Sequence, residues 1–210
     1  MNKIFRSALF MFIITLFFTS LVTAVKMVNE DRIKINREIK LQRTVLKVLG
    51  IERAKTLTPE KVMLIFKNRI KQVKAKNKIL YICRDEDGEG ITGYAFPLDG
   101  PGFWGPVYAM AAVNQEATRL LGISFYRHSE TPGLGGRISE DWFSNQFKGL
   151  LLETSEKDKS FFSLTPEGDN KTDNELDAIT GASRTSEAVE LFLNRELKIV
   201  ANDIKNNKLE

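Results

Sequence analysis

Cysteine and histidine are almost absent from this chain of 210 residues, which contains one of each. Cys83 has no second cysteine with which to form an internal disulfide bond, and the chain lacks the set of cysteines that holds an iron–sulfur cluster. A single histidine, His128, argues against a histidine-rich metal site. We therefore expect no metal centre in this chain.

Strong charge of one sign is also missing. The chain has 31 basic and 27 acidic residues, a formal net charge of +4, which is typical of solvated helix faces and not of a nucleic-acid surface. No G-x-G-x-x-G segment opens a βαβ unit, so nothing indicates that the chain binds NADH.

One long apolar run is present at the N-terminus. The 19 residues from Ser7 to Val25 carry no charge, and as a helix they would span about 28 Å, enough to cross a bilayer core. Lys3 and Arg6 precede the run, which predicts a cytoplasmic N-terminus and a single-pass anchor in the inner membrane. A cleaved signal peptide ending near Val22-Thr23-Ala24 is the alternative. Both interpretations place the remaining chain on the periplasmic side.

The rest of the chain is predicted to form one domain behind a helical spacer. Thr58 and Pro59 have the N-cap and first-position signature of a helix, and apolar residues recur at helical spacing on either side of this point. We expect four parts: an anchor (1–25), a helical membrane-proximal region (26–77), a folded domain (78–204) and a tail (205–210).

Alternating apolar residues predict antiparallel strands in the domain. The runs 79–84 and 91–96 flank an acidic, glycine-containing turn, and the runs 107–113 and 120–128 flank a short polar stretch, so each pair is typical of a hairpin. From Thr185 to Val200 the spacing becomes helical. The predicted class is α+β, an antiparallel sheet with packing helices.

Two glycine-rich loops follow strands. Between Leu98 and Pro106, glycines and prolines surround Phe103 and Trp104, and this composition is equally compatible with rings in the core and rings against a ligand. Between His128 and Gly136, Gly133 and Gly135 permit backbone geometries that side chains would block, and Thr131 and the backbone amides are hydrogen-bond donors. From the residues alone, a structural surface loop is favoured over a ligand-binding loop.

The stretch from Asp177 to Ser186 leads into the last predicted helix. Gly181 and Ala182 bring the backbone close to whatever lies there, and Ser183 is expected at the helix N-terminus, where unpaired N–H groups and the helix dipole favour a phosphate. A helix start with an ordinary cap is the alternative that the residues leave open.

At these residues the chain resembles a known family. Asp177 to Ser183 resembles the flavinylation motif D-x-x-[ST]-G-A-[ST], and 130–135 resembles the E-T-P-G-L-G signature, in the order expected for the FMN-binding domains of the Rnf complex G subunit and the sodium-translocating NADH:quinone reductase C subunit. The acceptor in that family is usually threonine, and here it is Ser183.

The resemblance implies that Ser183 carries FMN through a phosphoester bond. It implies that Asp177 and Thr180 serve recognition by the flavin transferase that attaches FMN, while Gly181 and Ala182 shape the backbone beside the phosphate. These residues are cofactor-binding candidates on the strength of the resemblance.

The resemblance also implies ring contacts. Leu134 and one of Phe103 and Trp104 are expected against the isoalloxazine, with Thr131 and Glu130 near its polar edge. The loop glycines of 133–135 would let the backbone approach the ring.

The implied function is a covalent FMN-carrying electron-transfer subunit of a membrane ion-translocating oxidoreductase complex, a redox subunit and not a self-sufficient enzyme. Its partners would be the other subunits of an Rnf-type or sodium-pumping complex, the flavin transferase and the membrane, and not nucleic acid. The sequence leaves both branches open. Two alternatives are a stand-alone exported flavoprotein and a membrane-anchored binding domain without covalent flavin.

Overall fold

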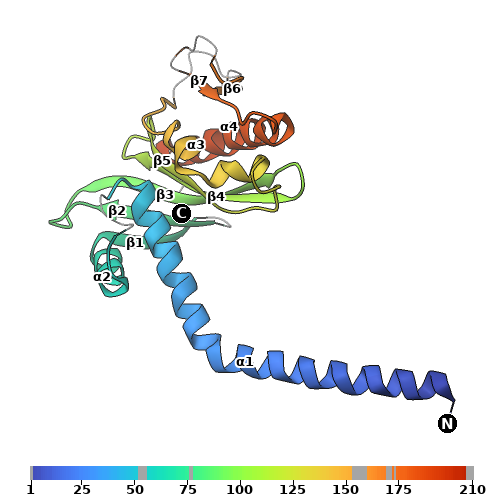
Figure 1. Ribbon diagram of the computed structural model, residues 1–210. Coiled ribbons are helices and arrows are strands. Elements are labelled where there is room, and N and C mark those ends of the chain that lie inside the picture. Colours follow the sequence, from blue (N-terminus) through green and yellow to red (C-terminus); the bar gives the residue numbers. More distant parts are fainter. Residues whose placement is uncertain are drawn as a thin grey trace. The chain divides into compact units, whose positions relative to one another are not determined.

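The computed structural model describes residues 2–51, 56–75, 78–152, 160–168, 172 and 174–206. The chain divides into two units, Met1–Leu41 and Gln42–Glu210, and α1 (Lys3–Val48) passes from one into the other. The further elements are α2 (Pro59–Arg69), β1 (Ile70–Ala75), β2 (Lys78–Arg84), β3 (Ile91–Pro101), β4 (Pro106–Asn114), β5 (Leu120–Arg127), the 3₁₀ helix η1 (Gly135–Ser139), α3 (Asp141–Asn145), β6 (Ser163–Thr165), β7 (Glu175–Asp177) and α4 (Ser183–Lys205). The α+β class is confirmed (Figure 1).

The first unit is a helix whose apolar side chains are exposed. Phe10, Phe12 and Phe17 are each more than half exposed, and none of the most apolar window is buried in the chain. By length and composition the helix can cross a membrane, a test that an anchor and a signal sequence both pass. Beyond the apolar run, Glu30 and Lys34 form an exposed ion pair of 3.0 Å, typical of a solvated helix.

The second unit is built on a five-stranded antiparallel sheet. Its strands lie in chain order, β1-β2-β3-β4-β5, so each strand pairs with its neighbour in the sequence. The hairpins predicted around the turn 85–90 and around the stretch 114–119 are both present. Pairing of Pro101 with Pro106, and of Tyr108 with Arg127, brings the end of β3, the start of β4 and the end of β5 to the same edge of the sheet.

The strand β1 departs from the helical prediction for 26–77. The apolar spacing of Val62 and Phe66 extends to Ile70 at helical intervals, but α2 ends at Arg69 and the chain continues as an edge strand. Pairing with β2, from Ile70 opposite Cys83 to Ala75 opposite Lys78, supplies the backbone partners that the local sequence does not announce.

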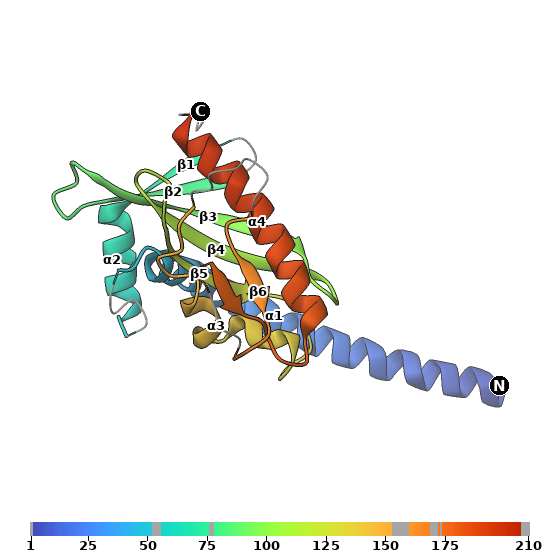
Figure 2. The same cartoon turned by 90° about the horizontal axis from the view of Figure 1, so that it is seen from above.

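Helices cover both faces of the sheet (Figures 1 and 2). On one face, Phe96, Leu98 and Phe125 pack with α3 and α4 in the main core. On the other, the Phe66 ring of α2 meets Tyr81 with centroids 6.0 Å apart. Cys83 of β2 is buried, with 2% of its surface exposed.

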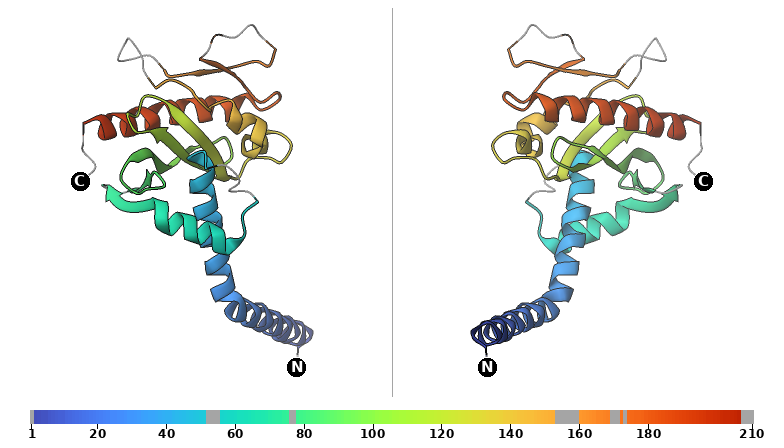
Figure 3. Two further views of the ribbon diagram at one scale, coloured as in Figure 1. Left: turned by 90° about the vertical axis from the view of Figure 1, so that its left-hand side faces the viewer. Right: turned by 90° about the vertical axis from the view of Figure 1, so that its right-hand side faces the viewer.

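The helix α4 runs across the sheet because its apolar residues form one stripe. Val189, Phe192, Leu193 and Leu197 are buried at helical spacing, and Lys205 in the last turn complements the helix dipole. On its outer side, the short parallel pair β6–β7 is held to it by a bond of 2.7 Å from the Leu164 amide to Glu190 Oε2 (Figure 3).

We predict that the ion pair between Lys78 and Glu196 makes stability depend on pH. Lys78 Nζ donates to Glu196 Oε2 at 2.6 Å and joins β2 to α4. Partial burial acts to raise the pKa of Glu196, but the hydrogen bonds and charges of Lys78 and Arg195 outweigh it, so this pKa lies below its usual value. A lowered folded-state pKa stabilises the fold above the unfolded pKa, and this contribution is lost as the pH falls through the folded pKa.

Glu196→Gln should therefore lower the free energy of unfolding by about 0.5–1 kcal/mol near neutral pH. The difference from the wild type should vanish in acid, well below the ordinary glutamate pKa of about 4.3. Urea unfolding of the full chain in detergent measures both, with Glu187→Gln on the exposed side of α4 as the control. A difference that is the same at both pH values would contradict the prediction.

Candidate functional site

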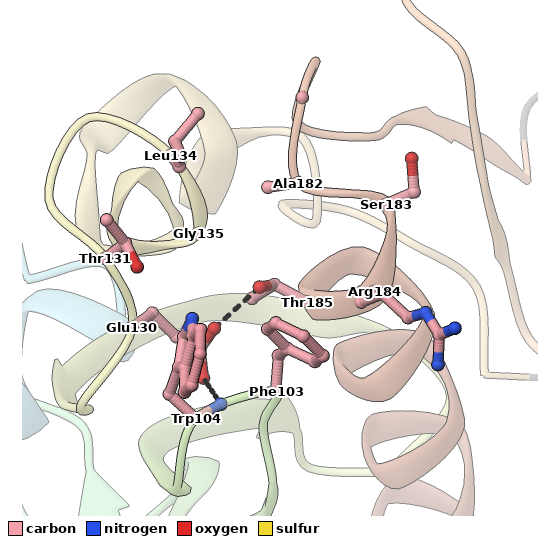
Figure 4. Close-up of a pocket in the computed structure, with 11 residues that line it drawn as sticks. Phe103, Trp104, Glu130, Thr131, Leu134, Gly135, Ala182, Ser183, Arg184 and Thr185 are labelled. Atoms are coloured by element: carbon pink, nitrogen blue, oxygen red, sulfur yellow. Dashed lines mark hydrogen bonds between the residues drawn. The ribbon is translucent and has the colours of Figure 1, made fainter.

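Three loops meet at one end of the sheet and line an open pocket. They are the β3–β4 loop, the segment after β5 and the turn before α4, and the strand register places the first two side by side. The cavity has a volume of about 410 Å³, within the usual range for small-molecule sites. Figure 4 shows its lining: Phe103, Trp104, Glu130, Thr131, Leu134, Gly135, Gly181, Ala182, Ser183, Arg184 and Thr185.

The β3–β4 loop presents two aromatic rings to the pocket. The Gly102 amide donates to the Gly105 carbonyl at 2.8 Å and closes the turn tightly. Phe103 and Trp104 stack edge to face, with centroids 5.0 Å apart, and are 50% and 66% exposed. The rings therefore are not tucked into the core, which was one of the two interpretations that the composition allowed.

The segment after β5 turns sharply through its glycines. Gly133 has a φ of +75°, a conformation that side chains disfavour. The Thr131 carbonyl accepts from the Leu134 amide at 3.2 Å and from the Gly136 amide at 2.9 Å, which holds the turn and starts η1. Leu134 at its tip is 45% exposed and lines the pocket.

The turn before α4 places Ser183 at the helix N-terminus, as predicted. Gly181 has a φ of +78°, Ala182 is the N-cap residue and Ser183 is the first, exposed residue of α4. The hydroxyl of Ser186 accepts from the Ile179 amide at 3.0 Å and donates to the Ala182 carbonyl at 3.2 Å, so it fixes the turn from within. The first amides of α4 have no partner within the helix and face a position suited to an anion.

A buried carboxylate joins the three loops. Glu130 is 4% exposed; its Oε1 accepts from the Trp104 amide at 3.0 Å, and its Oε2 accepts from the Thr185 hydroxyl at 2.6 Å. The resemblance placed Glu130 near the polar edge of a ligand. In the structure it lines the base of the pocket with both oxygens engaged by the protein (Figure 4).

The pocket therefore offers two kinds of surface. Exposed rings and Leu134 can contact a flat apolar group, and the α4 N-terminus with the Arg184 guanidinium can hold an anion. A flavin carrying a phosphate has both features, so the lining fits it. Among the residues that the structure describes, no three His, Cys, Asp or Glu side chains gather as metal ligands.

Comparison with known proteins shows which proteins this chain is similar to. A profile of the FMN-binding domain matches residues 102–198. The C subunit of the Na⁺-translocating NADH-quinone reductase of Vibrio alginolyticus is 27% identical over 139 residues, 66% of this chain and 52% of the relative. Its counterpart from Neisseria meningitidis serogroup A is 32% identical over 117 residues, 56% of this chain and 45% of the relative. This chain contains an FMN-binding domain and is homologous to these C subunits.

The homology covers part of each relative, and the fold is shared more widely. The chain spans about half the length of the curated relatives it matches. The crystal structure of Shewanella oneidensis NqrC superposes with a TM-score of 0.69 at 20% identity, over 80% of this chain and 97% of that one. The crystal structure of the corresponding reductase component from Parabacteroides distasonis gives 0.65 at 23% identity, over 82% and 93%. At these identities the superpositions show a common fold.

Some of the predicted cofactor-binding residues do not line the cavity. Asp177 ends β7, and its amide donates to Gln146 Oε1 at 2.6 Å. The Thr180 hydroxyl donates to Glu167 Oε2 at 3.1 Å. Gly133 shapes its turn but does not line the cavity. These positions suit a role in recognition or loop geometry better than direct contact with a ligand.

Sequence reasoning did not single out two lining residues, Arg184 and Thr185. Both follow directly after the flavinylation motif, and the helical phase of α4 could have indicated them. One turn of helix places residues 183–185 around the N-terminus, so a site at Ser183 also involves the next two side chains.

We predict that Gly135→Ala destabilises the domain. A Cβ at this position would collide with Thr185 Oγ1 and lie 2.8 Å from Glu130 Oε2. Relief requires a shift of the buried carboxylate or of α4, which should cost about 1–3 kcal/mol of unfolding free energy. Urea unfolding of the full chain in detergent measures the loss.

The matched control is Gly105→Ala in the neighbouring loop. A Cβ there would approach Ser129 Cβ at 3.3 Å, a contact that a small adjustment relieves, so little loss is expected. If both variants unfold like the wild type, the loops are not packed as tightly as the structure indicates.

Proposed function

We propose that this chain is the membrane-anchored, FMN-carrying electron-transfer subunit of a complex of the Na⁺-translocating NADH-quinone reductase type. The observation that carries the proposal is the placement of Ser183, an exposed hydroxyl at the first residue of α4 and at the wall of a pocket with two exposed aromatic rings. The homology to C subunits supports this type of complex. FMN, when bound, supplies one- and two-electron chemistry.

In this proposal each loop has a separate task. Ser183 Oγ would form a bond to the FMN phosphorus and lose its proton, while the phosphoanhydride bond of an activated flavin nucleotide, the substrate of the flavin transferase, breaks and releases a nucleoside monophosphate. The first amides of α4 and Arg184 hold the phosphate. Phe103, Trp104 and Leu134 orient the ring and exclude water from it.

The location follows from the apolar part of α1. Lys3 and Arg6 precede a run long enough to cross the bilayer, so we place the N-terminus in the cytoplasm and the domain on the periplasmic side of the inner membrane. A covalent link suits a domain outside the cytoplasm, where a lost cofactor is hard to replace. Other subunits of the complex would supply and accept the electrons.

We predict that Ser183 is the point of attachment. Produced with a flavin transferase, the wild type should gain the mass of one FMN less one water and retain flavin fluorescence after denaturation. Ser183→Ala should gain neither, and Ser183→Thr should restore both, because threonine offers the same nucleophilic oxygen. Intact mass spectrometry and in-gel fluorescence are the measurements.

Thr92→Ala is the control, since Thr92 is an exposed hydroxyl residue on β3 away from the pocket. Flavin on Ser183→Ala would move the attachment elsewhere. Flavin on none of the variants would instead favour an anchored binding domain without a covalent cofactor. Flavinylation at Ser183 without co-purifying membrane subunits would favour a stand-alone exported flavoprotein.

We further predict that the apolar helix is responsible for membrane association. The full chain should sediment with membranes, resist extraction by carbonate and dissolve in detergent. A chain without residues 2–41 should remain in the supernatant, because that unit holds the exposed apolar run. Membrane association that survives the deletion would contradict this role.

A further inference from the structure

The Glu130 carboxylate links all three loops of the pocket. It belongs to the segment after β5, it accepts from the Trp104 amide of the β3–β4 loop, and it accepts from the Thr185 hydroxyl in the first turn of α4. Thr185 itself is 3% exposed, so this bond lies out of water. Loops that are far apart in the sequence are thus joined at one buried side chain.

Two glycines leave the space that this carboxylate fills. A Cβ on Gly102 would lie 2.5 Å from Glu130 Oε1, and a Cβ on Gly135 would lie 2.8 Å from Oε2. Both loops therefore approach the carboxylate more closely than any side chain would allow. The backbones at Gly102 and Gly135 therefore pack closely around the Glu130 carboxylate.

The Glu130 carboxylate is hydrogen-bonded but not paired with a cation in the described part of the chain. Both donors to Glu130 are neutral, and no Lys, Arg or His nitrogen in the described part of the chain lies within ion-pair distance of its oxygens. The positive end of the α4 dipole offsets part of the cost of burying it. An ionised Glu130 therefore places a negative charge at the base of the pocket, where water screens it weakly.

We propose that Glu130 is the positioning residue of this site. It fixes the N-terminus of α4, where Ser183 lies, relative to the β3–β4 loop that carries Phe103 and Trp104. Its charge also lowers the reduction potential of a flavin held there. The second part rests on the proposed function. Reduction brings negative charge to a flavin ring, so a fixed negative charge beside it makes reduction less favourable. The hydrogen bond from Thr185 to Glu130 fixes the position of α4 relative to this loop.

The first test needs no cofactor. Hydrogen–deuterium exchange of the full chain in detergent reports the Trp104 amide and the first turn of α4 directly. Thr185→Val removes the hydroxyl but keeps the shape and the charge of Glu130, and it should speed exchange of the Trp104 amide at least tenfold. Thr185→Ser should restore the wild-type rate.

A control separates this effect from general loss of stability. Phe147 is fully buried in the core away from the pocket, so Phe147→Leu should destabilise the fold without altering the hydrogen bonds of Glu130. It should leave exchange at Trp104 close to the wild-type rate under conditions where the fold is intact. Equal exchange in Thr185→Val and the wild type would overturn the positioning role, whether or not the chain ever binds FMN.

The second test uses the flavin-loaded chain. Glu130→Gln keeps the shape and removes the charge, and it should raise the equilibrium constant for two-electron reduction about tenfold, a shift of about 30 mV. Thr185→Val and Phe147→Leu keep the charge and should shift the potential much less. A redox titration with dithionite, followed by flavin absorbance, measures it.

The outcomes are distinguishable. A wild type that takes up no FMN would defeat the proposed function and with it the lowered potential, while exchange at Trp104 still decides the positioning role. A loaded Glu130→Gln chain with an unchanged potential would overturn the electrostatic role and leave the proposed function standing.

Discussion

The packing of α4 on the sheet is the interaction on which the pocket depends. Phe192 lies against Gly100 of β3 so closely that a Cβ there would collide with its ring. Phe192, Leu193 and Leu197 are each no more than 1% exposed, and burial of such side chains contributes about 1.5–3 kcal/mol apiece. Ser183 precedes Phe192 by nine residues of one helix, roughly 14 Å, so the contact with Gly100 determines where the hydroxyl lies.

The pocket is open, and this bears on how it holds a ligand. Phe103, Trp104 and Leu134 are exposed by 50%, 66% and 45%, an apolar surface that a flat ring would cover. Affinity from one covered face is limited because binding must also offset the lost freedom of the ligand. A phosphoester at Ser183 removes that cost permanently, which is a physical reason for the proposed covalent attachment in a shallow site.

Local signals predicted most of the fold. Thr58 is the N-cap residue of α2 and Pro59 its first residue, as their sequence signature indicated, although the Thr58 side chain makes no capping bond. The two hairpins follow from apolar alternation, and Gly181 before a helical pattern indicated the start of α4. Each of these depends on neighbours in the sequence, which is why the residues alone suffice.

The features that could not be predicted depend on contacts between distant segments. Nothing in Ile70 to Ala75 distinguishes a strand from a continued helix until β2 supplies its hydrogen bonds. The resemblance implied a place for Glu130 near the polar edge of a ligand, and the burial of its carboxylate was not part of that prediction. Its burial follows from the missing side chains of Gly102 and Gly135, which the sequence shows but whose proximity it does not.

The charged groups of the pocket differ in sign between its two ends. The N-terminus of α4 and Arg184 favour negative charge at one end, and an ionised Glu130 disfavours it at the base, so in the proposed function the phosphate of FMN would lie toward Ser183. This preference would act before any covalent bond forms, because both fields come from groups fixed by the fold. Since Thr185 belongs to the same helical turn and bonds to the same carboxylate, the two ends cannot move independently. In the proposed function, the geometry that presents the acceptor hydroxyl is therefore also the geometry that determines the field at the ring.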